Sequence, residues 1–191
     1  MYPTPLYAPA GHGAFTDVYE PAEGSFLLMD ALEKDATVCL EVGSGSGVVS
    51  AFLASVVGPG ALYLCTDVNP AAAQCTLQTA RCNHLQLQPV ITDLVQCLLP
   101  RLNGKVDVLV FNPPYVVTPS DEFSLTLVIY HGLFYLVTVS ENHPAIVDVL
   151  RDSGLNGELC LTRQAGHERL SILRFSKSSL LSTEADVLRF P

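Results

Sequence analysis

The feature that most constrains the fold is a run of alternating glycine and serine, residues 43–47, that joins two apolar stretches. The stretch before it, residues 37–42, has the length and apolar character of a buried strand. The stretch after it, residues 48–57, is long enough for a helix and ends before Gly58-Pro59-Gly60. Glycine permits the tight turn by which a strand leads directly into a helix. The run therefore predicts a strand–turn–helix unit, which is the repeating unit of α/β domains.

Further apolar segments continue this alternation along the chain. We predict strands over residues 61–66, 88–92, 106–111 and 133–139, helices over 21–32, 69–82 and 144–151, and a hairpin over 158–163 and 170–175. Apolar strands that alternate with helices indicate a parallel sheet covered on both faces. We expect one doubly wound α/β domain over residues 21–176, preceded by an arm (1–20) and followed by a loose tail (177–191).

Composition excludes several classes of protein. With 49% hydrophobic residues and a mean hydropathy of +0.34, the chain is not disordered throughout. No apolar run approaches the roughly 20 residues that a membrane-spanning helix needs, so we expect no membrane partner. No basic stretch precedes an apolar one at the N-terminus, so we expect no export. The net charge of −9 disfavours a nucleic-acid partner, because such a surface repels phosphate.

The six cysteines could suggest a disulfide framework. However, no signal peptide is expected, no Cys-x-x-Cys pair is present, and no histidine stands at zinc-finger spacing from a cysteine. We therefore expect buried, reduced thiols and no bound metal.

Ligands of open parallel sheets bind beyond the carboxyl ends of the strands. Two candidate features fall there in the first half of the chain. The spacing of Gly43, Gly45 and Gly47 is not the Gly-x-Gly-x-x-Gly of dinucleotide sites, and the turn could serve packing alone. Asp67 ends the second predicted strand, where a carboxylate can accept both hydroxyls of a ribose or simply form a turn.

The third candidate is Asn112-Pro113-Pro114-Tyr115, which follows the fourth predicted strand. The two prolines make this loop rigid, so the Asn112 side-chain oxygen and the Pro113 carbonyl can point at one position. Two such acceptors suit a planar –NH₂ group, whose face Tyr115 would cover. The alternative is a rigid turn with Asn112 as a cap. We favour a site that binds an amino group.

These features resemble the class I S-adenosylmethionine-dependent methyltransferases that modify amino nitrogens, which have a Rossmann-like fold. The chain is most similar to the eukaryotic HemK-type release-factor glutamine methyltransferases, a family also described as N6-adenine DNA methyltransferases. The similarity extends over most of residues 13–176. It rests on FTDVYEPAE (15–23), EVGSGSGVVSAFL (41–53), CTDVNP (65–70), PVITDL (89–94), VLVFNPPYVV (108–117) and GLFYLV (132–137).

The resemblance implies S-adenosyl-L-methionine as cofactor and a role for each matching residue. It places Glu41, Gly43 and Gly45 at the methionine end of the cofactor, Asp67 at the ribose, and Asp93 and Leu94 at the adenine. It also counts Ser25 and Asn112 among the residues that bind the cofactor. Asn112 and the carbonyl of Pro113, in the loop shared with Pro114 and Tyr115, would hold the carboxamide nitrogen of a glutamine. No metal is implied.

The resemblance also implies two partners: the Gly-Gly-Gln loop of a class I translation release factor as substrate, and a small zinc-binding activator subunit that adds a strand to edge strand 88–92. The implied localisation is cytoplasm and nucleus. Alternative substrates are adenine in DNA and histone lysine.

Two departures from the family bear on activity. Relatives usually have an acidic residue at the position of Gly24, and they carry a longer segment, including a helix, where this chain has residues 118–131. We expect a shortened variant that lacks a crossover helix after the Asn-Pro-Pro-Tyr loop. An inactive protein that still binds the activator subunit is therefore a further alternative.

Overall fold

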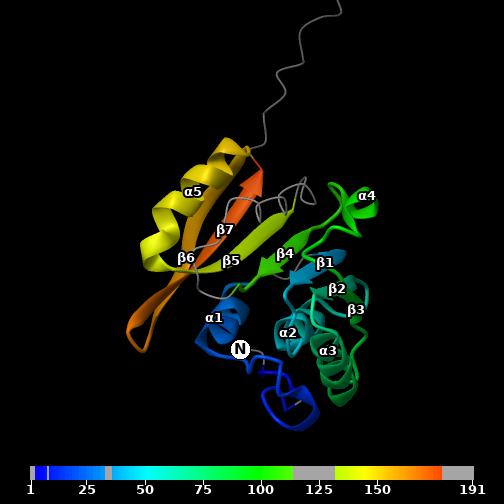
Figure 1. Ribbon diagram of the computed structural model, residues 1–191. Helices are drawn as coiled ribbons and strands as arrows, with labels where there is room; N and C mark the ends of the chain where they lie inside the picture. Colours follow the sequence, from blue (N-terminus) through cyan, green and yellow to red (C-terminus); the bar gives the residue numbers. More distant parts are fainter. Residues whose placement is uncertain (1–2, 8, 33–35, 114–131, 178–191) are drawn as a thin grey trace, which may run out of the picture.

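A single mixed sheet with seven strands forms the centre of the computed structural model, which describes residues 3–7, 9–32, 36–113 and 132–177 (Figure 1). The strand order is β3-β2-β1-β4-β5-β7-β6. Strands β1 to β5 are parallel, and β7 is antiparallel to both of its neighbours, β5 and β6. The strands are β1 (Val38–Val42), β2 (Leu62–Asp67), β3 (Gln88–Ile91), β4 (Val108–Phe111), β5 (Leu133–Val139), β6 (Leu155–Ala165) and β7 (Glu168–Lys177).

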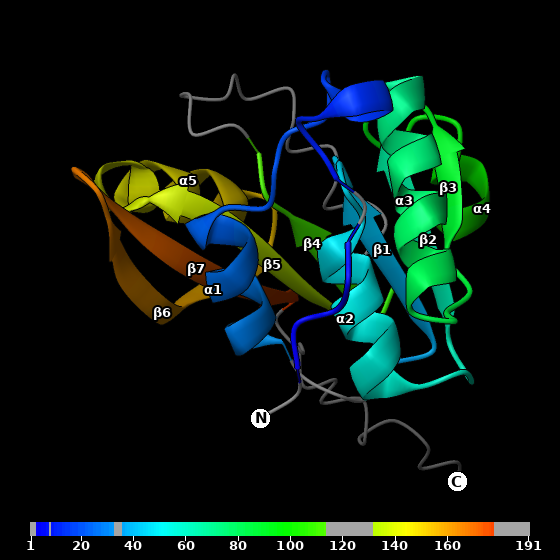
Figure 2. The same cartoon turned by 90° about the horizontal axis from the view of Figure 1, so that it is seen from below.

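Helices lie on both faces of this sheet (Figure 2). They are η1 (Gly13–Phe15), α1 (Glu23–Ala31), α2 (Val48–Val57), α3 (Pro70–Cys82), α4 (Leu99–Leu102), η3 (Ser140–Asn142) and α5 (His143–Asp152). Helices α1 and α2 contribute to the apolar layer on one face, and α4 and α5 to the layer on the other. The sheet is doubly wound, as the alternation in the sequence predicts.

Successive strand residues divide between these two apolar layers because side chains alternate across a sheet. On β1, Cys39 packs with α1 and α2 while Leu40 packs on the opposite face. On β5, Tyr135 lies on the α1 face and Phe134 on the α5 face, where its ring centroid is 5.7 Å from that of Phe175. Both faces are buried, which explains why these strands are apolar throughout.

The N-terminal arm packs along α3 (Figure 1). Ala10 and Val18 share a small apolar cluster with Ala72 and Cys75 of α3. At the far end of the helix, the backbone N–H of Leu6 donates to the Asn83 side-chain oxygen at 2.9 Å. The arm therefore packs against α3 near its start and is bonded to its end.

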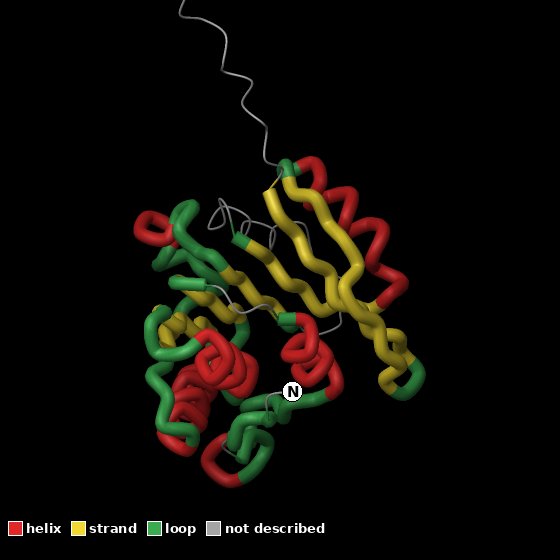
Figure 3. Tube along the Cα trace, turned by 180° about the vertical axis from the view of Figure 1, so that it is seen from behind, coloured by secondary structure: helices red, strands yellow, loops and turns green. Residues whose placement is uncertain are grey.

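The structure confirms the α/β fold and corrects some boundaries. Helix α2 and strand β5 have the predicted bounds, whereas α1 begins at Glu23, because Ala22 is still extended. The β6–β7 hairpin is longer than predicted, with only Gly166 and His167 between its strands, and it projects beyond the sheet (Figure 3). The predicted absence of a crossover helix concerns residues 118–131, which lie outside the described ranges. Most of the predicted tail also lies outside them. The domain boundaries stay predictions.

The expectation of buried thiols is correct for only half of the cysteines. Cys39, Cys65 and Cys75 are buried, but Cys82, at the end of α3, and Cys97, in the turn before α4, are exposed. All six are free. Within the described residues, no cluster of three or more metal-ligating side chains occurs, and no helix has the length and apolar character to cross a membrane.

Candidate active site

The predicted site residues lie at the carboxyl ends of four neighbouring strands. Val42 is level with Thr66 of β2 and Phe111 of β4, so Gly43, Asp67 and Asn112 follow side by side. Asp67 is level with Ile91 of β3, and Asp93 and Leu94 follow shortly after. The four strand ends thus form a strip in the order β3, β2, β1, β4, about 14 Å long at the usual strand spacing. The strand order reverses between β1 and β4, which is where open α/β sheets bind ligands.

The glycine-rich loop is supported on one side and open on the other. Gly47 has a φ of +75°, and a Cβ atom there would lie 2.8 Å from a Thr76 side-chain carbon, so only glycine fits against α3. The Thr76 hydroxyl donates to the Gly45 carbonyl at 3.3 Å. Gly45 has a φ of +52°, and no atom lies within 4 Å of the position that its Cβ would occupy. The backbone at Gly45 can therefore be approached closely by a ligand.

Asp67 combines a structural contact with spare hydrogen-bonding capacity. One carboxylate oxygen accepts the Gly45 N–H and the other accepts the Asn69 N–H, each at 2.9 Å. Each oxygen of a carboxylate has a further lone pair, and the residue is half-buried rather than enclosed. Asp67 can thus hold the loop and still accept two hydroxyl groups from a ribose.

Glu41 is buried behind the loop, where it binds the first turn of α2. Its carboxylate accepts the N–H of Ser50 at 2.9 Å and the Ser50 hydroxyl at 2.5 Å. Burial raises the pKa of Glu41 to about 8, against the lowering effect of the Ser50 hydrogen bonds, and the charge of Asp67 raises it further. In this structure Glu41 acts on the site by fixing the start of α2 behind the glycine loop.

The β3 end of the strip contains a strained residue and an exposed one. Leu94 has a φ of +46°, which is uncommon for a residue with a branched side chain and is often found at functional sites. Asp93 is exposed and accepts a hydrogen bond from the Gln96 amide at 3.2 Å. Val68, which directly follows Asp67, is 71% exposed. An apolar side chain held in solvent directly after Asp67 is suited to contact the flat face of a base.

The β4 end of the strip carries Asn112, whose side-chain amide is only partly satisfied. Its Nδ2 donates to the Ser25 hydroxyl at 3.3 Å. Its Oδ1 is buried and has no hydrogen-bond partner among the described residues. Pro113 follows directly, whereas Pro114 and Tyr115 lie outside the described ranges. A buried acceptor without a partner is costly, and a ligand group that donates a hydrogen bond can satisfy it.

The structure therefore brings together eight of the predicted residues on or beside one strip: Glu41, Gly43, Gly45, Asp67, Asp93, Leu94, Asn112 and Ser25. Sequence reasoning missed Val68, although an apolar residue between a strand-ending Asp and a helix cap is a usable signal. It also missed Thr76, because a threonine inside a helical pattern gives no indication that it touches a distant loop.

Comparison with known proteins agrees with this geometry. Residues 12–132 match the family model of the methyltransferase small domain. "Methyltransferase HEMK2" of Mus musculus is 58% identical over 208 aligned positions, which cover 92% of this chain and 97% of the relative. The human protein of the same name is 55% identical and covers 93% and 98%, respectively. The chain belongs to the HEMK2 methyltransferases.

The HEMK2 relationship extends to more distant proteins. The "eRF1 methyltransferase catalytic subunit mtq2" of Schizosaccharomyces pombe is 31% identical over 91% of this chain and 95% of its own length. Among solved structures, the E. cuniculi Mtq2–Trm112 complex, described as responsible for methylation of the eRF1 translation termination factor, is 27% identical. It has a TM-score of 0.65 and covers 85% of this chain and 99% of that one. The alignment with the mouse HEMK2 protein is longer than this chain of 191 residues, so some residues of that relative have no counterpart here.

A HEMK2 methyltransferase uses S-adenosylmethionine, and the described residues fit this cofactor. The free lone pairs of Asp67 suit the ribose hydroxyls, and the open space at Gly45 admits an atom against the backbone. Val68 is an exposed apolar residue directly after Asp67, in a position suited to the adenine. The partnerless oxygen of Asn112 lies at the other end of the strip.

Proposed function

We propose that this methyltransferase modifies the side-chain amide nitrogen of a glutamine in the Gly-Gly-Gln loop of a class I translation release factor. The observation that carries this proposal is the buried, partnerless Oδ1 of Asn112 at the end of β4. An oxygen without a hydrogen is a pure acceptor, and it selects a group that presents N–H bonds. The similarity to proteins whose names specify eRF1 supports a release factor as the bearer of that group.

The role of the protein in this reaction is to orient the acceptor nitrogen. The cofactor supplies a methyl group that is already electrophilic when bound. The oxygen of Asn112 accepts one N–H of the carboxamide, and the carbonyl of Pro113 is the natural second acceptor because it follows directly in a rigid loop. Acceptors on these N–H bonds oppose delocalisation of the nitrogen lone pair and stabilise the positive charge that develops as the nitrogen attacks. Fixing the nitrogen in line with the methyl group supplies the rest of the acceleration.

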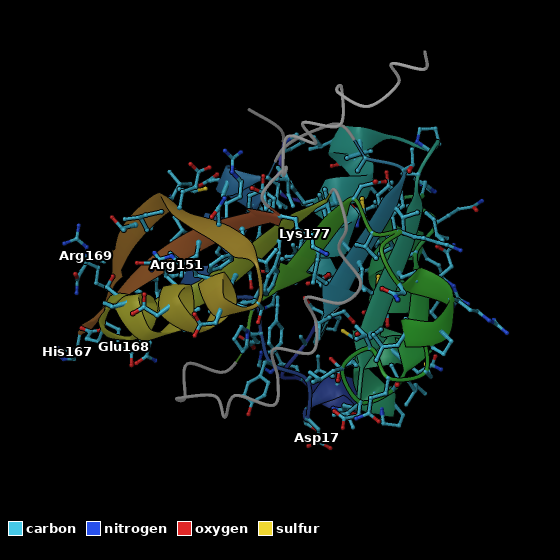
Figure 4. The ribbon with its side chains drawn as sticks, turned by 90° about the horizontal axis from the view of Figure 1, so that it is seen from above. Asp17, Arg151, His167, Glu168, Arg169 and Lys177 are labelled. Atoms are coloured by element: carbon cyan, nitrogen blue, oxygen red, sulfur yellow. The ribbon has the colours of Figure 1, made fainter. Side chains whose placement is uncertain are left out.

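The distribution of charge favours a protein substrate over nucleic acid. The chain has ten basic and nineteen acidic residues. Figure 4 places Arg151 on α5 and Lys177 at the end of β7, next to the start of the parallel strands and so opposite the strip. His167, Glu168 and Arg169 point away from the body at the tip of the hairpin (Figure 4). These positions do not form a basic track through the strip, which binding of a phosphate backbone would need.

We further propose that the small zinc-binding activator subunit pairs with β3, which is one edge of the sheet. The N–H of Thr92 donates to the main-chain carbonyl of Asp67 on β2 at 3.0 Å, so the alternation along the strand turns the backbone of Pro89 and Ile91 outward. Ile91 is 57% exposed. Proline on an edge strand is typical, and the outward groups of Ile91 remain available to an added strand. The Mtq2–Trm112 complex supports a partner of this kind.

The test is transfer of a radiolabelled methyl group from S-adenosylmethionine to purified release factor, with and without the activator. We expect labelling of the Gly-Gly-Gln glutamine that depends on the activator and is abolished by glutamine→alanine substitution in the release factor. Labelling of DNA or histone instead would overturn the substrate assignment. A stable complex with the activator but no labelling of any acceptor would indicate an inactive binding protein.

Strand addition at β3 has its own test. Ile91→Lys is expected to weaken binding of the activator by at least about tenfold, because it places a charge in the apolar part of the new interface. The matched control is Leu161→Lys on β6, the opposite edge of the sheet, where the side chain is 36% exposed. Equal loss of binding by both variants in pull-down and calorimetry would contradict docking at β3.

A further inference from the structure

We propose that Ser25 is a positioning residue that holds the Asn112 amide in the one orientation able to accept from the substrate nitrogen. This inference deepens the proposed function and rests on it, since it concerns the residue that receives the acceptor group. The resemblance assigns Ser25 to the cofactor. The geometry adds a direct contact with Asn112, which is 87 residues away in the sequence.

Ser25 is well placed to fix another side chain. It is the third residue of α1 and is only 8% exposed. Its backbone N–H donates to the Ala22 carbonyl at 2.9 Å, which anchors the first turn of the helix. The next turn of α1 is buried through Leu27 and Leu28. The Ser25 hydroxyl is thus presented from a fixed backbone, 3.3 Å from the Nδ2 of Asn112.

The contact matters because a primary amide has two unlike ends. With Nδ2 turned to Ser25, Oδ1 is left in the buried position that lacks a partner among the described residues. If the amide were rotated by half a turn, Nδ2 would occupy that position and would meet the N–H bonds of the substrate, donor against donor. An acceptor at residue 25 therefore favours the productive orientation over the rotated one.

A serine hydroxyl can perform this task and still serve the cofactor. Its oxygen accepts the Asn112 N–H, while its own proton remains available to donate to another acceptor. The two roles support each other, because a hydroxyl that donates its proton elsewhere can meet Asn112 only as an acceptor. Alanine would remove the acceptor, whereas threonine would keep it in nearly the same position.

The first test compares Ser25→Ala with Ser25→Thr in methyl transfer to the release factor. We expect Ser25→Ala to lower kcat, measured at saturating cofactor, by about tenfold, as for the loss of one hydrogen bond, with the KM for the release factor changed by less than about twofold. Ser25→Thr should recover most of the wild-type rate. A Ser25→Ala variant with normal kcat but weakened cofactor binding in calorimetry would overturn the positioning role.

The second test is a double-mutant cycle. If Ser25 acts through Asn112, then Ser25→Ala should have no further effect on kcat in an Asn112→Ala protein, measured by single-turnover transfer. An unchanged tenfold effect in that background would show that Ser25 acts independently and would overturn the proposal. Matching melting temperatures of all variants would exclude a folding defect as the cause.

A third readout does not depend on activity. In the wild type, the Asn112 side-chain –NH₂ should give distinct, protected signals in a ¹⁵N-correlated NMR spectrum, assigned by their loss in Asn112→Ala. Ser25→Ala should remove this protection and Ser25→Thr should retain it; unchanged protection in Ser25→Ala would contradict the proposal. If the wild type fails to label the release factor while this protection behaves as expected, the substrate proposal fails and the contact stands.

Discussion

The two ends of the parallel strands use their polar side chains in opposite ways. At the amino-terminal end, Asp107 accepts three hydrogen bonds, from the N–H and hydroxyl of Thr37 and the N–H of Val38, at 2.6–2.8 Å. At the carboxyl end, Asp67 keeps spare lone pairs, and the oxygen of Asn112 has no partner among the described residues. The hydrogen bonds of Asp107 join the start of β4 to that of β1, whereas Asp67 and Asn112 keep acceptor positions that a ligand can use. The comparison predicts that substitutions at one end alter stability and at the other alter catalysis.

The largest effect is expected at the carboxyl end, from Asn112→Ala. Loss of the acceptor should lower methyl transfer by about 100- to 1,000-fold, which is the range for removing one preorganised group from a developing charge. Because the side chain makes one long hydrogen bond within the described part of the chain, the free energy of unfolding should change by less than about 1 kcal/mol. Denaturant unfolding and single-turnover transfer measure the two quantities. If the loss of stability accounted for the loss of activity, the prediction that substitutions at the carboxyl end alter catalysis would be wrong.

At the amino-terminal end, Asp107→Ala should have the converse effect. Three hydrogen bonds are lost, so the free energy of unfolding should fall by about 3 kcal/mol, while cofactor affinity per folded molecule stays the same. Burial opposes ionisation of Asp107, but the bonds from Thr37 and Val38 outweigh it and lower its pKa. A lowered pKa stabilises the folded state above the ordinary value of 3.8, and this advantage is lost as pH falls through the folded-state pKa. The difference between wild type and variant should therefore shrink in acid.

Asp67 lies between these extremes, because it both holds the loop and faces the ligand. Asp67→Ala should weaken S-adenosylmethionine binding by about 10- to 100-fold, since both the loop contact and the charged acceptors are removed. The matched control is Asp93→Ala on the same strip, where the carboxylate is exposed and the effect should be only a few-fold. Isothermal calorimetry compares the two. Equal losses of affinity in the two variants would mean that the hydrogen bonds of Asp67 to the loop contribute nothing to cofactor binding.

The smallest effect concerns Glu41 and appears only as a dependence on pH. With its pKa raised to about 8 by burial, Glu41 retains a proton in the folded protein that the unfolded chain releases above about pH 4.5. Its contribution to stability therefore decreases as pH rises from 5 to 8. The free energy of unfolding of Glu41→Gln, whose side chain stays neutral, should therefore rise relative to that of the wild type across this window. A difference in the free energy of unfolding between the two proteins that stays the same from pH 5 to 8 would contradict a protonated Glu41.

The sequence predicts elements whose signal is local. Helix α2 is recognised because glycines at 47 and 58 bracket one apolar run, and its bounds are correct. The single turn α4 is too short to show a period, and so it was missed. Likewise, the Asn-Pro-Pro-Tyr motif identifies Asn112, but nothing in the local sequence connects Asn112 to Ser25. In the sequence alone, Asp107 is only a charged residue that interrupts an apolar strand. Contacts between distant segments decide which polar groups are satisfied, and these require the fold.

The position of β7 has a consequence for how the chain completes its fold. This strand comes last among the described elements, yet it is inserted between β5 and β6, which precede it. Until residues 168–177 have been synthesised, β5 remains an open edge and β6 has no neighbour in the sheet. The sheet therefore cannot grow outward strand by strand as the polypeptide emerges. Strands β5 and β6 therefore stay exposed to mispairing until β7 is available to join them.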